Sequence, residues 1–240
     1  MKLRAWLVGG VVLLALFFIV SLTLAGQRHN SPELIGSDVS WPNCQDPATF
    51  TSWGIVGVTG GLDFTTNKCL RTETAEFPSL ALYMNTGWPG SNFYLKFYNS
   101  PKYCSKANNV CLAYNYGFHA ASYAIDFAHR QLVSATSWWL DVETDNSWTT
   151  SFTQNQAALD GMIAAVKQEN LWAKVGFYAS PEQWSELVGN WRPNLPAWLA
   201  TGATTYGAAK AACFIPSFTD KPIVMTQYTP KLDQDLRCSS

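Results

Sequence analysis

The stretch Trp138-Trp139-Leu140-Asp141-Val142-Glu143 alternates in a way that predicts a β-strand with two different faces. One face carries a tryptophan, a leucine and a valine, and the other carries a tryptophan and two acids. This division fits the wall of a barrel of parallel strands, in which the apolar face meets the surrounding helices. Asp141 and Glu143 then point into the barrel at the carboxyl end of the strand, where barrel enzymes build their active sites.

Short apolar stretches alternate with helix-length patterns along the rest of the chain. Helical periodicity covers residues 113–133 and 152–170, and Ser180-Pro181-Glu182-Gln183 predicts a capped helix that ends near Val188. Repeated strand-helix units predict a parallel sheet of the α/β class, and about eight strands favour a closed (β/α)8 TIM-type barrel over an open doubly wound sheet. The candidate strands are residues 34–40, 54–59, 80–85, 138–143, 174–178, 197–200 and 223–228, with a weak one near 213–215.

The first 25 residues predict export. Lys2 and Arg4 precede an apolar run over residues 5–20, and Ala25 is a small residue suited to signal-peptidase cleavage. The run is also nearly long enough to span a bilayer, so a cleaved signal peptide and an uncleaved membrane anchor both remain open. In either case the positive-inside rule places the rest outside, secreted or anchored at the outer face of the cytoplasmic membrane. We expect residues 26–33 to be a linker, residues 34–240 to be the barrel domain, and membrane contact to occur only through an uncleaved N-terminal segment.

The cysteine content predicts a disulfide framework. Six cysteines all lie beyond the N-terminal segment, and an even number in an exported chain favours three disulfides. Their spacings do not resemble those of zinc ligands, and the chain has only 3 histidines, so we expect no metal site. Pairing of neighbours along the chain predicts the bridges Cys44–Cys69, Cys104–Cys111 and Cys213–Cys238.

Composition limits the class of ligand. The 16 basic and 17 acidic residues give a formal net charge of −1, which excludes the cationic field that nucleic acid binding needs. The 11 tryptophans and 10 tyrosines favour a large aromatic core, and sugar-binding clefts are also often built from such side chains. We found no nucleophile elbow, phosphate-binding loop or dinucleotide motif, and we therefore expect no cofactor. A single domain of this size is expected to be a monomer.

Two further acids are predicted at the same end of the barrel. Asp38 lies near the end of the first strand, and Asp235 follows the last one, although both are also typical of turns. The Cα atoms of Asp141 and Glu143 would lie about 6 to 7 Å apart, so the two acids repel each other and the pKa of the less solvated one is raised. A proton donor beside an anion is the arrangement that glycoside hydrolysis requires. The alternative is that these acids cap a helix or pair with a lysine.

Several motifs resemble a known family in sequence order. They are Gly36-Ser37-Asp38-Val39-Ser40, Leu140-Asp141-Val142-Glu143, Gly176-Phe177-Tyr178, Trp198-Leu199-Ala200 and Gln227-Tyr228-Thr229. Over residues 34–238 the chain resembles the family 25 glycoside hydrolases, the Chalaropsis-type lysozymes. An exported, lysozyme-like actinobacterial branch is similar in four further motifs, at residues 38–44, 57–61, 83–86 and 138–144.

The resemblance implies roles for individual residues. Glu143 would be the general acid, Asp141 would orient the substrate's N-acetyl group, and Asp38 and Asp235 would complete an acidic floor. The path to the last acid is shorter here than in the family, so Asp233 is an alternative to Asp235. The residues expected to contact the glycan are Tyr83, Asn85, Trp139, Tyr178, Trp198 and Gln227.

Two functions follow from this resemblance. The first is hydrolysis of β-1,4 bonds in peptidoglycan or another cell-wall glycan, without a metal or organic cofactor. The second is a barrel that binds wall glycan without cleaving it, in which the acids accept hydrogen bonds from sugar hydroxyls.

Overall fold

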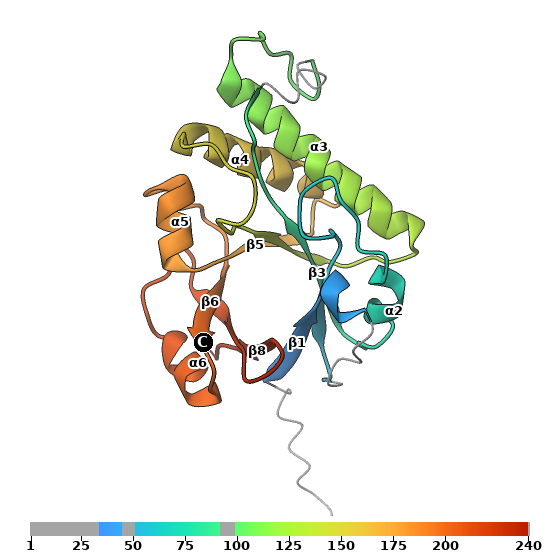
Figure 1. Cartoon of the computed structure of the whole chain (residues 1–240), viewed down its shortest axis with the longest axis vertical. Helices are drawn as coiled ribbons and strands as arrows, with labels where there is room; N and C mark the ends of the chain where they lie inside the picture. The colour runs from blue at the N-terminus through green and yellow to red at the C-terminus, as the bar shows by residue number, and fades with distance from the viewer. Residues whose placement is uncertain (1–33, 45–50, 92–98, 240) are drawn as a thin grey trace, which may run out of the picture. The chain divides into compact units, whose positions relative to one another are not determined.

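The computed structural model describes residues 34–44, 51–91 and 99–239, so the predicted N-terminal segment and linker lie outside the described residues. Eight strands close into a barrel in chain order, with helices outside (Figure 1), as the sequence predicts. The strands are β1 (Ile35–Val39), β2 (Gly54–Gly57), β3 (Leu80–Asn85), β4 (Ser137–Asp141), β5 (Lys174–Ala179), β6 (Ala197–Ala203), β7 (Ile223–Tyr228) and β8 (Gln234–Arg237).

The expectation of an all-parallel barrel is wrong for the last strand. Strands β1 to β7 pair in parallel, whereas β8 is antiparallel to both β7 and β1. Only a short turn joins β7 to β8, and a parallel connection needs a crossover of a dozen residues or more. The weak strand expected near residues 213–215 is also wrong, because Cys213 and Phe214 continue the turns at the end of a helix.

Five α-helices and one short 3₁₀ turn are found in the described part of the chain. The capping box predicted for α5 is confirmed: the Ser180 side chain accepts from the Gln183 N–H, and the Gln183 side chain accepts from the Ser180 N–H.

None of the helices within residues 34–44, 51–91 and 99–239 is long and apolar enough to cross a bilayer. The elements are η1 (Trp41–Asn43), α2 (Leu70–Thr74), α3 (Asn109–Arg130), α4 (Phe152–Glu169), α5 (Pro181–Val188) and α6 (Tyr206–Ala212); α2 and α6 were not predicted.

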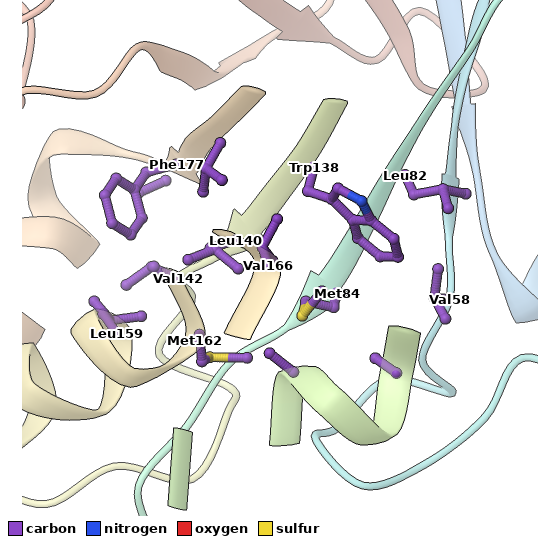
Figure 2. Packing of buried hydrophobic residues seen from close by; sticks show 14 of the residues in the cluster. Val58, Leu82, Met84, Trp138, Leu140, Val142, Leu159, Met162, Val166 and Phe177 are labelled. Carbon is purple, nitrogen blue, oxygen red and sulfur yellow. The ribbon is translucent and has the colours of Figure 1, made fainter. Parts of the chain in front are cut away.

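The two faces of β4 are oriented as the alternation predicts. Trp138, Leu140 and Val142 belong to the main hydrophobic core, where Leu140 and Val142 lie beside Leu159 and Met162 of α4 (Figure 2). Trp139 instead belongs to a separate cluster inside the barrel, with tryptophans from the β1–β2 loop and from β6. This arrangement leaves Asp141, two residues further on, facing the barrel interior.

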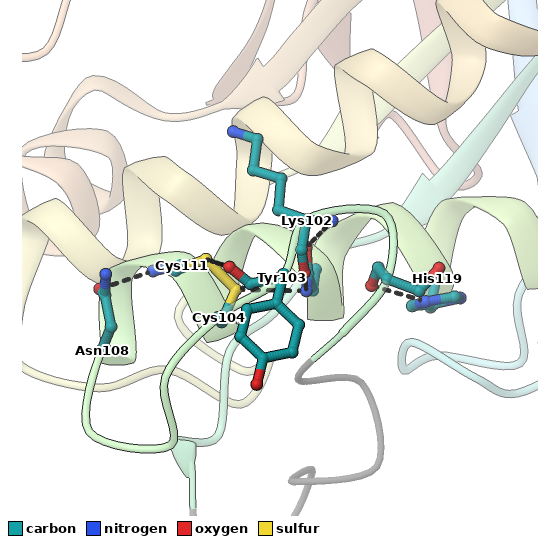
Figure 3. Close-up of a disulfide and its surroundings, with 8 residues drawn as sticks. Lys102, Tyr103, Cys104, Asn108, Cys111 and His119 are labelled. Carbon is teal, nitrogen blue, oxygen red and sulfur yellow. Dashed lines mark hydrogen bonds between the residues drawn. A yellow bond between two sulfur atoms is a disulfide. The ribbon is translucent and has the colours of Figure 1, made fainter.

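All three predicted disulfides are formed: Cys44–Cys69, Cys104–Cys111 and Cys213–Cys238. The Cys104–Cys111 bridge closes the loop before α3 (Figure 3), and Asn108 caps this helix by accepting from the Cys111 N–H at 3.1 Å. The Asn115 side chain also bonds both the N–H and the carbonyl oxygen of Lys102. These contacts hold the described part of the loop between β3 and α3 against this helix.

Candidate active site

A cavity of about 200 Å³ opens at the end of the barrel where the parallel strands finish. No lysine, arginine or histidine is among the described residues that line it, so carboxyl, amide and aromatic groups alone would meet a ligand there. Most of the predicted site residues line this cavity, and the exceptions are Asn85, Trp139 and Asp235. The lining residues are Asp38, Tyr83, Asp141, Glu143, Tyr178, Trp198, Gln227 and Asp233.

Asp141 is held by a chain of hydrogen bonds from the neighbouring strands. Asn85 at the end of β3 donates from Nδ2 to Asp141 Oδ2 at 2.5 Å, and Thr59 Oγ1 donates to Asn85 Oδ1 at 2.6 Å. The main-chain oxygen of Asp141 accepts from Thr86 Oγ1 at 2.6 Å. Asn85 does not line the cavity itself, but its hydrogen bond fixes the position of the Asp141 side chain.

Burial raises the pKa of Asp141 well above its ordinary value, and the charges of Glu143 and Asp38 raise it further. Its Oδ1 atom is buried and accepts no hydrogen bond from any described residue. The interaction with Glu143 adds to the raised pKa of Asp141, whereas the same interaction lowers the pKa of Glu143. Of these two acids, Asp141 is the more deeply buried, and burial disfavours its charged form.

Glu143 lies just beyond the end of β4, and its side chain is half-buried. Its pKa is raised, mainly by burial and then by the charges of Asp145 and Asp233, while hydrogen bonds from Asp141 and Gln183 oppose this. Because Gln183 Oε1 already accepts from the Ser180 N–H, the amide nitrogen is the group left to face Glu143. The start of α5 thus orients a donor toward this acid.

A second acid pair lies on the opposite wall. Gln227 donates from Nε2 to Asp38 Oδ2 at 2.9 Å and accepts from the Tyr178 hydroxyl at 2.7 Å. Burial, with the charge of Asp233, raises the pKa of Asp38 to about 7. Asp235 on β8 is wholly buried behind Asp38, and burial raises its pKa well above the ordinary value. Of the two alternatives for the last acid, Asp233 lines the cavity and Asp235 lies beneath it.

Three aromatic side chains complete the cavity. Trp198 is buried at its floor, with its ring centroid 4.4 Å from that of Tyr178. Burial and the surrounding carboxylates raise the pKa of Tyr83 and of Tyr178 well above the ordinary value, so both keep their hydroxyl protons as donors. A Cβ at Gly57 would lie 2.6 Å from Tyr83 Cζ, so a larger residue there would displace the Tyr83 ring.

Trp139 faces the barrel interior, as predicted, but does not line this cavity. Its ring centroid lies 5.8 Å from that of Trp198, and it lines a different cavity, of about 390 Å³, where the strands begin. Side chains two residues apart on a strand point the same way but lie in successive layers of the barrel. Trp139 is therefore one layer below Asp141, away from a ligand at the acids.

The chain matches a protein family described as lysozyme-like protein 1. The match covers residues 56–214, which is more than half of the chain. The chain belongs to this lysozyme-like family. The matched segment includes Asp141, Glu143 and Trp198, whereas Asp38 and Asp233 lie outside it. No curated protein matches the chain.

Some residues that shape this lysozyme-like site were not predicted. Thr59, Thr86 and Gln183 support the acids from neighbouring elements, and Trp148 donates from Nε1 to the main-chain oxygen of Glu143 at 2.9 Å. Thr86 directly follows β3 and Thr59 lies two residues after β2, so their position near strand ends is the signal that could have found them. The role of Trp148 depends on how its loop folds back, which no local pattern indicates.

The buried acids predict that this barrel is less stable at high pH. A carboxyl whose pKa is raised by folding stabilises the protein below its unfolded pKa of about 4, and this contribution is lost as pH rises through the folded pKa. For Asp38 this contribution is lost as the pH rises from 3.8 to about 7. For Asp235 the loss also begins at pH 3.8 and continues to higher pH, because its pKa is raised well above the ordinary value. We expect Asp235→Asn, which keeps the shape without the charge, to gain on the order of 2 kcal/mol over the wild type at pH 8.

Urea unfolding at pH 5 and pH 8 measures this effect. The difference between the two pH values should be smaller in Asp235→Asn than in the wild type, whereas Asp220→Asn, at an exposed position, should follow the wild type. Equal pH dependence in all three proteins would mean that Asp235 does not titrate as its burial requires.

Proposed function

We propose that the protein is an exported muramidase of the family 25 glycoside hydrolase type, which hydrolyses β-1,4 bonds of peptidoglycan. The observation that carries this proposal is the Asp141–Glu143 pair, a buried acid and a half-buried acid that line the same cavity and whose pKa values are both raised by burial. Membership of the lysozyme-like family supports a glycan substrate. The three disulfides support an oxidising compartment outside the cytoplasm.

Glu143 is the proton donor in this proposal. Its raised pKa keeps it protonated at mildly acidic pH, and it gives the proton to the glycosidic oxygen as the bond to the anomeric carbon breaks. The hydrogen bond from Asp141 then stabilises the new carboxylate of Glu143. In the second half of the reaction, this carboxylate accepts a proton from the attacking water.

The substrate's own N-acetyl group serves as the nucleophile. Its carbonyl oxygen attacks the anomeric carbon, and water later opens the cyclic intermediate with overall retention. Asp141, held by Asn85, orients this acetamide group. Asp38, fixed by Gln227, and the aromatic rings of Tyr178 and Trp198 hold the sugar against the opposite wall and the floor.

Incubation of the protein with purified, insoluble peptidoglycan tests the proposal. A hydrolase releases new reducing ends in proportion to time and enzyme, over a range from pH 4 to 8. A barrel that sediments with peptidoglycan at every pH and releases no reducing ends is a glycan-binding protein, and that result would overturn the proposal.

The pH dependence of cleavage can be tested with a substitution outside the cavity, which leaves the lining residues unchanged. Asp145 is exposed and lies outside the cavity, but its charge raises the pKa of Glu143. Asp145→Asn should lower this pKa, and the high-pH limb of activity should move to lower pH, because a general acid works only while protonated. The rate at low pH should stay unchanged, and the shift should shrink in high salt.

Full pH profiles of kcat for the two proteins measure the shift. Asp126→Asn on α3 is a matched control, since this exposed residue does not contribute to the pKa of Glu143. A limb that moves to higher pH in Asp145→Asn would contradict the assignment of Glu143 as the acid.

A further inference from the structure

Large apolar side chains are exposed on three loops that each join a helix to the following strand. Leu132 lies between α3 and β4 with 81% of its surface exposed, Leu171 and Trp172 lie between α4 and β5 at 71% and 87%, and Phe214 lies between α6 and β7 at 75%. In a barrel of parallel strands, all such loops lie at the end where the strands begin. We call these four residues the amino-end surface.

Leu132, Leu171 and Trp172 lie on the loops that lead into the adjacent strands β4 and β5. Single exposed apolar residues are normal, whereas several large ones on neighbouring loops favour a site that a partner covers. Ile215, next to Phe214, and Val224, at the start of β7, are also exposed on this end, at 43% and 39%. The catalytic proposal uses none of these residues, because the acid-lined cavity lies at the opposite end.

The same end of the barrel carries exposed basic residues beside the apolar ones. Among them are Arg130, Lys174, Arg192, Lys221 and Arg237, and the acids Glu76, Glu169 and Asp220 lie at the same end. The opposite mouth carries the carboxyl groups of the candidate active site. Cations that surround exposed apolar and aromatic side chains are the pattern that proteins present to anionic lipid headgroups.

The chain also enters the barrel from this end. Strand β1 begins beside the end of β8, where the Arg237 N–H donates to the Leu34 oxygen at 2.9 Å. If the N-terminal segment of 25 residues stays uncleaved, the eight linker residues 26–33 that separate it from this point span at most about 28 Å. A bilayer that holds the apolar run is therefore within reach of the amino-end surface.

We propose that the amino-end surface lies against the headgroup layer of an anionic phospholipid bilayer. Trp172 is suited to this position, because its ring combines an apolar body with an N–H donor and tryptophan is enriched at membrane interfaces. Leu132, Leu171 and Phe214 enter the same layer, and Lys174 and Lys221 meet the phosphates. The mouth with Glu143 then faces away from the membrane.

The full chain, inserted into phosphatidylcholine vesicles with or without phosphatidylglycerol, tests this orientation. All six native cysteines are paired, so a single new cysteine takes an environment-sensitive dye. The informative variant is Trp172→Cys. The matched control is Tyr206→Cys, because Tyr206 is 39% exposed at the start of α6 and lies at the opposite end of the barrel.

We expect the dye at position 172 to shift to shorter wavelength, to be quenched by nitroxide lipids and to lose quenching by aqueous iodide, most strongly with phosphatidylglycerol. The dye at position 206 should remain open to iodide, although the N-terminal segment holds both proteins on the vesicle. Lys174→Glu with Lys221→Glu should remove the effect of phosphatidylglycerol and leave thermal unfolding unchanged, since both lysines are exposed.

Two results would overturn the proposal. One is equal iodide quenching at positions 172 and 206. The other is protection at position 172 that disappears when the chains are diluted over more vesicles and that nitroxide lipids do not quench, because this result assigns the surface to a second copy of the chain.

Discussion

The Glu143→Gln protein is expected to lose glycan cleavage by a factor of about 10² to 10⁴. Glutamine keeps the shape of the side chain and can still accept a hydrogen bond from Asp141, but it cannot give a proton to the glycosidic oxygen. The free energy of unfolding should not fall, because the raised pKa of Glu143 shows that its charged form is disfavoured in the folded state. The loss of cleavage would therefore come from the missing proton donor and not from unfolding.

Initial rates of reducing-end release, with urea unfolding of the same samples, measure both quantities. Glu186→Gln makes the same chemical change at an exposed position of α5 and should retain the wild-type rate. Sedimentation with peptidoglycan should remain close to wild type in Glu143→Gln. A rate within a few-fold of wild type in that variant would remove Glu143 as the acid.

The Gly117→Ala protein should lose about 3 kcal/mol or more of folding free energy. Helices α3 and α4 cross so closely that a Cβ at Gly117 would lie 1.8 Å from the main-chain oxygen of Ala158. On the other side of the crossing, a Cβ at Gly161 would lie 1.9 Å from the main-chain oxygen of Tyr114. Backbone atoms cannot rotate away, so one added methyl group must push the two helices apart.

Urea denaturation measures this loss, and Gly207→Ala provides the control. Gly207 also lies within a helix, α6, but a Cβ there meets nothing within 4 Å. Alanine at position 207 should leave the stability unchanged or raise it slightly, since Gly207 lies in the first turn of α6 and the added methyl group meets nothing. Equal stability of Gly117→Ala and wild type would show that α3 and α4 do not pack through these glycines.

The barrel was predictable where local patterns carry the signal. Alternation in residues 138–143 assigned the faces of β4 correctly, and the Ser180-Pro181-Glu182-Gln183 pattern placed the start of α5. The last strand was not predictable in this way, because Gln234–Arg237 is short and polar and becomes a strand only by pairing with β1 and β7. The strand expected at residues 213–215 was wrong for a related reason. No local sequence pattern shows that these apolar residues are exposed in the turn after α6.

The sequence predicted which side chains face the barrel interior, but not how far along the barrel axis each of them lies. Strand alternation shows that Trp139 and Asp141 face inward, but it does not show that one layer of the barrel separates Trp139 from the cavity. The same limit applies to the last acids, where Asp233 reaches the cavity and Asp235 is buried behind Asp38. Depth depends on the stagger of neighbouring strands, which is set only when the barrel closes.

Mass analysis of the soluble products from purified peptidoglycan tests the proposed function most directly. The wild-type protein should release fragments that end in reducing N-acetylmuramic acid, and Glu143→Gln should release almost none under the same conditions. Wild-type protein that binds peptidoglycan but yields no soluble fragments between pH 4 and 8 would contradict hydrolysis. Fragments that end in reducing N-acetylglucosamine would contradict the proposed bond.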